Sequence, residues 1–131
     1  MFINTEELLV AFFQPFSPGN VAVKMPANPV VPFVVPVRIS GGDDRITDLA
    51  IADVHVFHSS RDLANAAAWQ LHSWVRSWTP QTGVTLPSTG EMVFIDRIET
   101  ILGPHWVDYG DENLQRYLMR YQVTSRLTSS R

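Results

Sequence analysis

Hydrophobic and polar positions alternate most strictly between residues 114 and 127. Side chains of a strand point alternately to opposite faces. One face takes Tyr117, Met119, Tyr121 and Val123, and the other takes Arg116, Leu118, Arg120, Gln122 and Thr124. This pattern predicts an antiparallel strand with one face in the core and one face in contact with water.

A different period marks residues 60–78. Apolar side chains recur there at helical spacing, at Leu63, Ala67, Leu71, Trp74, Val75 and Trp78. One apolar stripe with a period of 3.6 predicts an amphipathic helix. Ser59 is the expected N-cap, with Asp62 three residues further on. Trp69 does not fit the stripe, because it lies roughly 160° from its centre at about 100° per residue.

Shorter signals complete the chain. Residues 33–40, 46–58 and 91–102 are predicted as strands, 40–44 as a turn, and 78–90 and 103–113 as loops. A helix is expected before Pro15, capped by Asn4 or Thr5, with Glu6 and Glu7 in its first turn. Its core positions would be Leu8, Leu9, Phe12 and Phe13.

Residues 15–36 hold six of the nine prolines, and the rest of this segment is largely apolar. So much proline excludes a helix and a central strand. The segment is therefore predicted to be an extended arm. Two alternatives stay open: an arm that packs on its own domain, and an arm that docks on a neighbouring subunit.

Together these elements predict one α+β domain over residues 1–131. Its antiparallel sheet has about four strands, and an N-terminal helix and one long helix pack on one face. The proline-rich extended arm is added to this unit. At 131 residues the chain is long enough to bury a core without a metal or a disulfide.

Composition narrows the function classes. The net charge is −3, which gives no electrostatic basis for tight nucleic-acid binding. The absence of cysteine excludes disulfides and thiolate chemistry. No apolar run approaches the ~20 residues of a membrane span, and no targeting segment is expected. Nine arginines to one lysine indicate a GC-rich genome.

No catalytic, cofactor or metal signature is present in the sequence. His55 and His58 are three apart in a predicted strand, so they point to opposite faces and do not share a metal. Ser59 lacks the glycines of a nucleophile elbow. Acids at 108–112 lack the order of a calcium-binding loop. We expect no enzyme and no cofactor, with a small hydrolase using His58 and Ser59 as the less favoured alternative.

The polar side of the long helix carries Trp69, His72 and Arg76. Tryptophan and arginine are enriched at protein interfaces. An incidental exposed tryptophan is the alternative. Apolar and aromatic residues in the arm and in the loops strengthen the hypothesis of a protein that assembles with others.

Two blocks of the chain, DVHVFHSSRDLANAAAWQLHSW and MVFIDRIETILGPHWVDYGDENLQRYLMRYQVTSR, carry a resemblance. They are similar to small neck and tail-completion proteins of long-tailed phages of actinobacteria, in particular to tail terminators. The resemblance covers roughly residues 53–126 and leaves out the N-terminal segment. None of its motifs is catalytic.

The resemblance implies a structural virion protein, made in the host cytoplasm and placed at the neck. Tail terminators form a hexameric ring that caps the major tail tube protein, stops tube growth and meets the head–tail connector or head-closure protein. Genomic DNA passes through the lumen without sequence-specific recognition, and no membrane is involved. Another neck component, such as a head-closure or minor tail protein, is the nearest alternative. The expected contact residues are Trp69, His72, Arg76, Pro29, Val31, Phe33, Asp43, Asp44, Trp106, Tyr109, Arg116 and Arg120.

Overall fold

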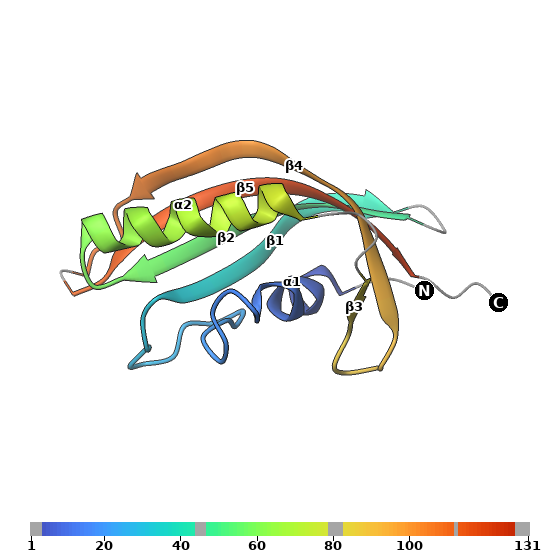
Figure 1. The fold of residues 1–131 in the computed structure, drawn as a ribbon, viewed down its shortest axis with the longest axis horizontal. Helices are drawn as coiled ribbons and strands as arrows, with labels where there is room; N and C mark the ends of the chain where they lie inside the picture. Colours follow the sequence, from blue (N-terminus) through green and yellow to red (C-terminus); the bar gives the residue numbers. More distant parts are fainter. Residues whose placement is uncertain (1–3, 44–46, 79–82, 112, 128–131) are drawn as a thin grey trace.

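The computed structural model describes residues 4–43, 47–78, 83–111 and 113–127. It is an α+β protein with two helices and one curled antiparallel sheet of five strands over these residues (Figure 1). The elements follow the order α1 (Thr5–Phe13), β1 (Phe33–Asp43), β2 (Thr47–His58), α2 (Arg61–Ser77), β3 (Gly83–Thr85), β4 (Met92–Val107) and β5 (Gln115–Leu127). The strand order across the sheet is β1-β2-β5-β4-β3.

The predicted alternation of β5 is confirmed. Tyr117, Met119, Tyr121 and Val123 are all buried, and the residues between them are partly exposed. β2 contributes Ala52, Val54 and Val56 to the same face. Both helices cover this face, because residues of α1 and α2 join these strand residues in one hydrophobic cluster. Neither of the two described helices packs on the opposite face, which is called the helix-free face below.

α1 begins as predicted. The Asn4 side chain accepts a hydrogen bond from the Glu7 N–H at 3.1 Å, so Asn4 and not Thr5 is the N-cap. Leu8, Leu9, Phe12 and Phe13 are buried, as expected. Phe12 packs against Trp74 and Trp78 of α2, with ring centroids 4.7 and 5.7 Å away. These aromatic contacts hold the two helices together over the sheet.

The start of α2 corrects the prediction by one residue. Ser60, and not Ser59, is the N-cap, and its Oγ accepts from the Leu63 N–H at 3.2 Å. The buried face is also rotated from the predicted stripe. Ala64, Ala68, Leu71 and Val75 are buried, whereas Leu63 is 48% exposed. Alanine at the contact lets α2 lie close to the sheet, which shifts the helix face that meets it.

Three strand predictions were too short or missing. β1 continues to Asp43 through the predicted turn at 40–44, and Asp44 lies outside the described residues. β4 continues to Val107, well into the predicted loop at 103–113. β3 occupies part of the predicted loop at 78–90. The sheet therefore has five strands over the described residues, where about four were expected.

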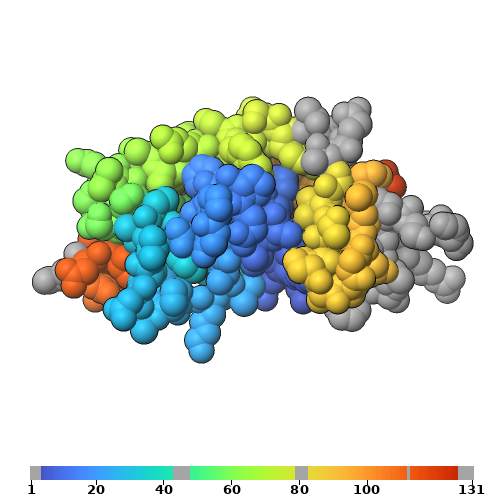
Figure 2. Space-filling model, turned by 60° about the horizontal axis from the view of Figure 1, so that its bottom comes forward, coloured from blue at the N-terminus to red at the C-terminus, as the bar shows by residue number. Residues whose placement is uncertain are grey.

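Residues 15–36 are all described, and they form no extended proline-rich arm. Residues 15–32 form turns and bends that fold back on the same chain, and residues 33–36 belong to β1. Val21 is buried and bridges Val34, and the Ser17 hydroxyl donates to the Pro32 carbonyl at 3.1 Å. In Figure 2 the darkest blue, α1, borders the yellow β3–β4 hairpin, and the lighter blue of this segment lies on the side of α1 away from the hairpin. The buried side chain of Val21 and local turns hold residues 15–32 in a compact loop.

Candidate interaction surface

The exposed side of α2 places three predicted contact residues together. Trp69 is 50% exposed, and its ring meets the His72 ring edge-on at a centroid distance of 5.7 Å. Arg76 lies one turn further along and borders the same shallow hollow of about 560 Å³, together with Ser73 and Ser77. Trp69 points away from the buried face, as its position in the helical pattern predicted.

His72 contacts the sheet through Tyr121. Its Nδ1 lies 2.7 Å from the phenolic oxygen of Tyr121 on β5, and the two rings stack at 5.8 Å. Partial burial and the charge of Arg76 lower the pKa of His72. Burial raises the pKa of Tyr121 well above its usual range, so the phenol keeps its proton. His72 therefore lies between the Tyr121 ring and the Trp69 ring, and its lowered pKa favours the neutral imidazole.

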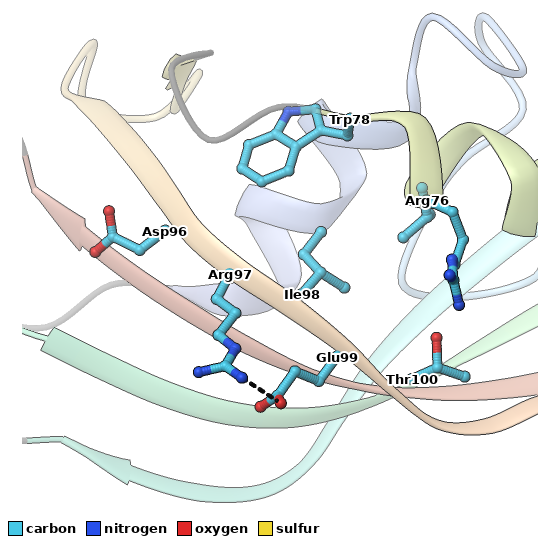
Figure 3. Close-up of a pocket in the computed structure, with 8 residues that line it drawn as sticks. Arg76, Trp78, Asp96, Arg97, Ile98, Glu99 and Thr100 are labelled. Carbon is cyan, nitrogen blue, oxygen red and sulfur yellow. Dashed lines mark ion pairs between the residues drawn. The ribbon is translucent and has the colours of Figure 1, made fainter.

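A groove of about 520 Å³ separates the end of α2 from β4 (Figure 3). Its walls are Val75, Arg76 and Trp78 from the α2 end, and residues 96–100 from β4. The Arg76 side chain points down toward Thr100, while Arg97 and Glu99 form an ion pair of 2.9 Å (Figure 3). The Trp78 Nε1 is buried and has no hydrogen-bond partner among the described residues. Arg76 borders both hollows, so the Trp69 surface and this groove are neighbours.

A second group of predicted contact residues lies at the end of the sheet where β4 meets β5. The Arg61 guanidinium lies 4.4 Å from the centre of the Trp106 ring, and the Trp106 Nε1–H donates to Gln115 at 3.0 Å. Tyr109 packs edge-on against Phe57 at 4.8 Å. Trp106 and Tyr109 are still 36% and 40% exposed, so both present aromatic surface at this end.

Arg116 belongs to the same end. It donates to the Asp108 carbonyl at 2.9 Å, and its guanidinium lies 5.3 Å from the centre of the Tyr109 ring. Its charge adds to burial in lowering the pKa of His55 on the neighbouring strand, against the opposing effect of Asp53. The His55 Nδ1 and the Arg116 Nε are buried without a hydrogen-bond partner among the described residues.

The remaining predicted contact residues are spread out. Phe33 is only 5% exposed, because Phe57 and the loop side chains of Ala22 and Met25 surround it. Pro29 and Val31 are partly buried in the loop before β1. Arg120 lies in the middle of the helix-free face, where its Nε donates to Asp53 at 2.7 Å. Asp43 ends β1 at the opposite end of the sheet from Trp106.

His58 and Ser59, which the hydrolase alternative would use, lie at and just after the end of β2. Ser59 Oγ is 3.2 Å from the His58 Nδ1, but the Ser59 backbone N–H already donates to that nitrogen at 2.8 Å. The Nδ1 of His58 therefore accepts a local backbone hydrogen bond. Over the residues that the structure describes, His, Asp and Glu side chains form no group of three or more able to hold a metal ion. No helix within those residues is long and apolar enough to cross a membrane.

Sequence reasoning missed three parts of this surface: the support of His72 by Tyr121, the cover of Arg61 on Trp106, and the position of Arg97 and Glu99 beside α2. Each joins residues of different elements, so no local spacing indicates it. Comparison with models of known protein families and with curated proteins finds nothing that matches this chain.

Proposed function

We propose that this chain is a structural virion protein, the tail terminator of a long-tailed phage. Copies of it form a ring that caps the tail tube, stops tube polymerisation and joins the tail to the head connector. The resemblance of residues 53–126 supports this proposal, and so does the α+β fold that the resemblance implies.

The observation that carries the proposal is the distribution of the contact residues over three separate surfaces. Trp69, His72 and Arg76 lie on one flank of the molecule, on α2. Trp106 and Tyr109 lie at one end of the sheet, and Asp43, the last residue of β1, lies at the other end. A subunit of a stacked ring needs a flank for its neighbour and two ends for the parts above and below. A cyclic ring also requires two different patches on each subunit.

In this arrangement Trp69 acts as an aromatic anchor in the contact between neighbouring subunits. The few residues that dominate the binding energy of typical interfaces are enriched in tryptophan and arginine. The stacked His72 limits the motion of the indole before binding, which reduces the entropy lost on association. The two ends then meet the tail tube protein and the head-closure protein. DNA passes through the ring lumen without sequence recognition.

Negative-stain imaging of the purified protein with polymerising tail tube protein tests this function. We expect tubes capped at one end and shorter than those grown without the protein. Trp69→Ala should abolish capping while the variant stays folded. Asn65→Ala, an exposed position one turn earlier on α2, is the matched control and should cap normally. A folded protein that neither binds tube ends nor changes tube length would refute the proposal.

A further inference from the structure

The outer side of α2 carries a stripe of residues at coiled-coil spacing. Its members follow one another at intervals of four, three, four and three residues, which is the spacing of a helix seam that packs against a second helix. All of them are exposed, and the buried residues of α2 lie on the other side of the helix. This outer stripe consists of Asp62, Ala66, Trp69, Ser73 and Arg76.

The outer stripe complements itself when it is read in the opposite direction. Trp69 lies at its centre, seven residues after Asp62 and seven residues before Arg76. An antiparallel second α2, related by a two-fold axis at Trp69, therefore places Asp62 of each copy beside Arg76 of the other. A parallel pair would place each of these charges beside the same charge of the other copy, which is unfavourable.

The residues on either side of Trp69 leave room for a second indole. Ala66 and Ser73 are small, and in antiparallel packing each lies across from the other. Trp69 of one copy then enters the hole between Ala66, Trp69 and Ser73 of the other, as a knob does in a coiled coil. Large side chains that face small ones interdigitate well in such a contact. The edge-on contact with His72 limits the directions that the indole can take.

We infer that two copies of this chain pair through their outer stripes, antiparallel and about a two-fold axis at Trp69. A second copy is the partner that the charges at the two ends of the stripe select. The Arg76 side chain points toward Thr100 in the single chain (Figure 3), and because it is exposed it can turn to Asp62 of the partner. The 17 residues of α2 span only about 25 Å, so the contact is small and the dimer forms with rising concentration.

This pair and the proposed ring compete for Trp69. A two-fold contact uses the same patch on both copies and closes after two, so it does not build a ring. If the tail-terminator function is right, the dimer keeps the Trp69 surface covered until tail tube protein is present. The inference itself concerns the free protein and does not depend on that function.

Charge reversal within one chain tests the pairing. Asp62→Arg places two cations at each end of the pair, and Arg76→Asp places two anions there. Each single variant should lose the dimer that the unchanged protein forms over a concentration series in analytical ultracentrifugation. The double variant Asp62→Arg, Arg76→Asp restores opposite charges and should dimerise again. The two positions are about 21 Å apart along the helix, so no contact within one chain accounts for this recovery.

Helix stability predicts a different order among the variants, which separates it from pairing. Asp62 in the first turn and Arg76 in the last turn both favour the helix dipole, so the double variant has the least stable α2. Circular dichroism checks that all variants are folded. Gln70→Arg, at an exposed position of α2 outside the outer stripe, is the control and should leave the dimer intact.

Three outcomes would overturn the inference: an unchanged protein that stays monomeric or forms only larger rings, single variants that dimerise as well as it does, or a folded double variant that stays monomeric. Tube capping keeps the two proposals separable. Asp62→Arg should still cap tail tubes if the tail-terminator function is right, because Asp62 is not among the contact residues of the ring. An unchanged protein that dimerises through the outer stripe but never caps tubes supports the inference and counts against that function alone.

Discussion

The imidazole of His72 on α2 rests on the phenol of Tyr121 on β5, with the Nδ1 2.7 Å from the phenolic oxygen and the rings stacked at 5.8 Å. The two residues are 49 positions apart in the chain. This contact ties the exposed side of α2 to the buried face of the sheet. The position of Trp69 follows from it, because the indole packs edge-on against the same imidazole.

Tyr121→Phe should lower the free energy of unfolding by about 0.5–1.5 kcal/mol, the net value of a typical hydrogen bond. The ring stack stays, so the fold should be preserved. Chemical denaturation measures the change. Tyr117→Phe, whose hydroxyl makes no such contact with α2 among the described residues, is the control. Equal losses in both variants would contradict a specific role of the His72–Tyr121 contact.

Stability should fall on acidification below about pH 6.5, the pKa of histidine in an unfolded chain. Burial lowers the pKa of both His55 and His72 in the folded protein, helped by Arg116 and Arg76 respectively. The unfolded chain therefore binds more protons as the pH drops, which favours unfolding. The stabilising contribution of the two neutral histidines is fully present above the pKa of histidine in the unfolded chain. Denaturation midpoints from pH 5 to 8 should show this slope, and the His55→Asn, His72→Asn double variant should flatten it.

Gly41→Ala should be strongly destabilising. Gly41 has φ of +127°, and a Cβ there would clash with the Leu49 carbonyl oxygen of the paired strand. We expect a loss of about 3 kcal/mol or more, because both backbone strain and a backbone clash act at this position. Gly42→Ala is the matched control, since its Cβ would meet nothing within 4 Å. Comparable melting temperatures for the two variants would contradict this account of the β1 edge.

Arg38→Ala should destabilise the junction of α1 with the sheet. Arg38 donates to Asp48 at 3.1 Å, and Asp48 also accepts from the Thr5 hydroxyl at 2.8 Å. Asp48 is 5% exposed, so the variant leaves a buried carboxylate without its cation. Removing one partner of such a pair costs about 3–5 kcal/mol. Thermal unfolding of Arg38→Ala beside Arg38→Ala/Asp48→Ala should show partial recovery in the double variant.

Local physical chemistry accounts for the elements that could be predicted from the sequence. The alternation of apolar and polar residues from Tyr117 to Val123 identified the buried face of β5. Successive side chains of a strand point to opposite faces, so a strand with one face in the core and one in water must alternate in this way. The helical period placed α2 and left Trp69 on the outside. The absence of cysteine excluded disulfides and thiolate chemistry directly.

Where local sequence signals pointed to another structure, tertiary contacts determined the structure that forms. Gly41 and Pro104 indicated a turn and a loop, yet both lie within strands. Gly41 fits the close approach of β2, and Pro104 is tolerated because β4 is an edge strand at that point. Leu63 matched the apolar stripe but is exposed, since the alanines of α2 set the face that packs closest to the sheet. The proline-rich segment forms a folded loop because Val21 makes a backbone bridge to Val34.

The sequence by itself determined the fold class, the two helices, the buried face of β5, and the outward direction of Trp69. These follow from periodicity, which each segment carries independently of the rest. Only the tertiary structure decided the order of the strands in the sheet, that Tyr121 supports His72, and that Arg97 and Glu99 border a groove beside α2. Strand order and contacts between distant residues depend on how the whole chain closes around its core, and no local pattern encodes that.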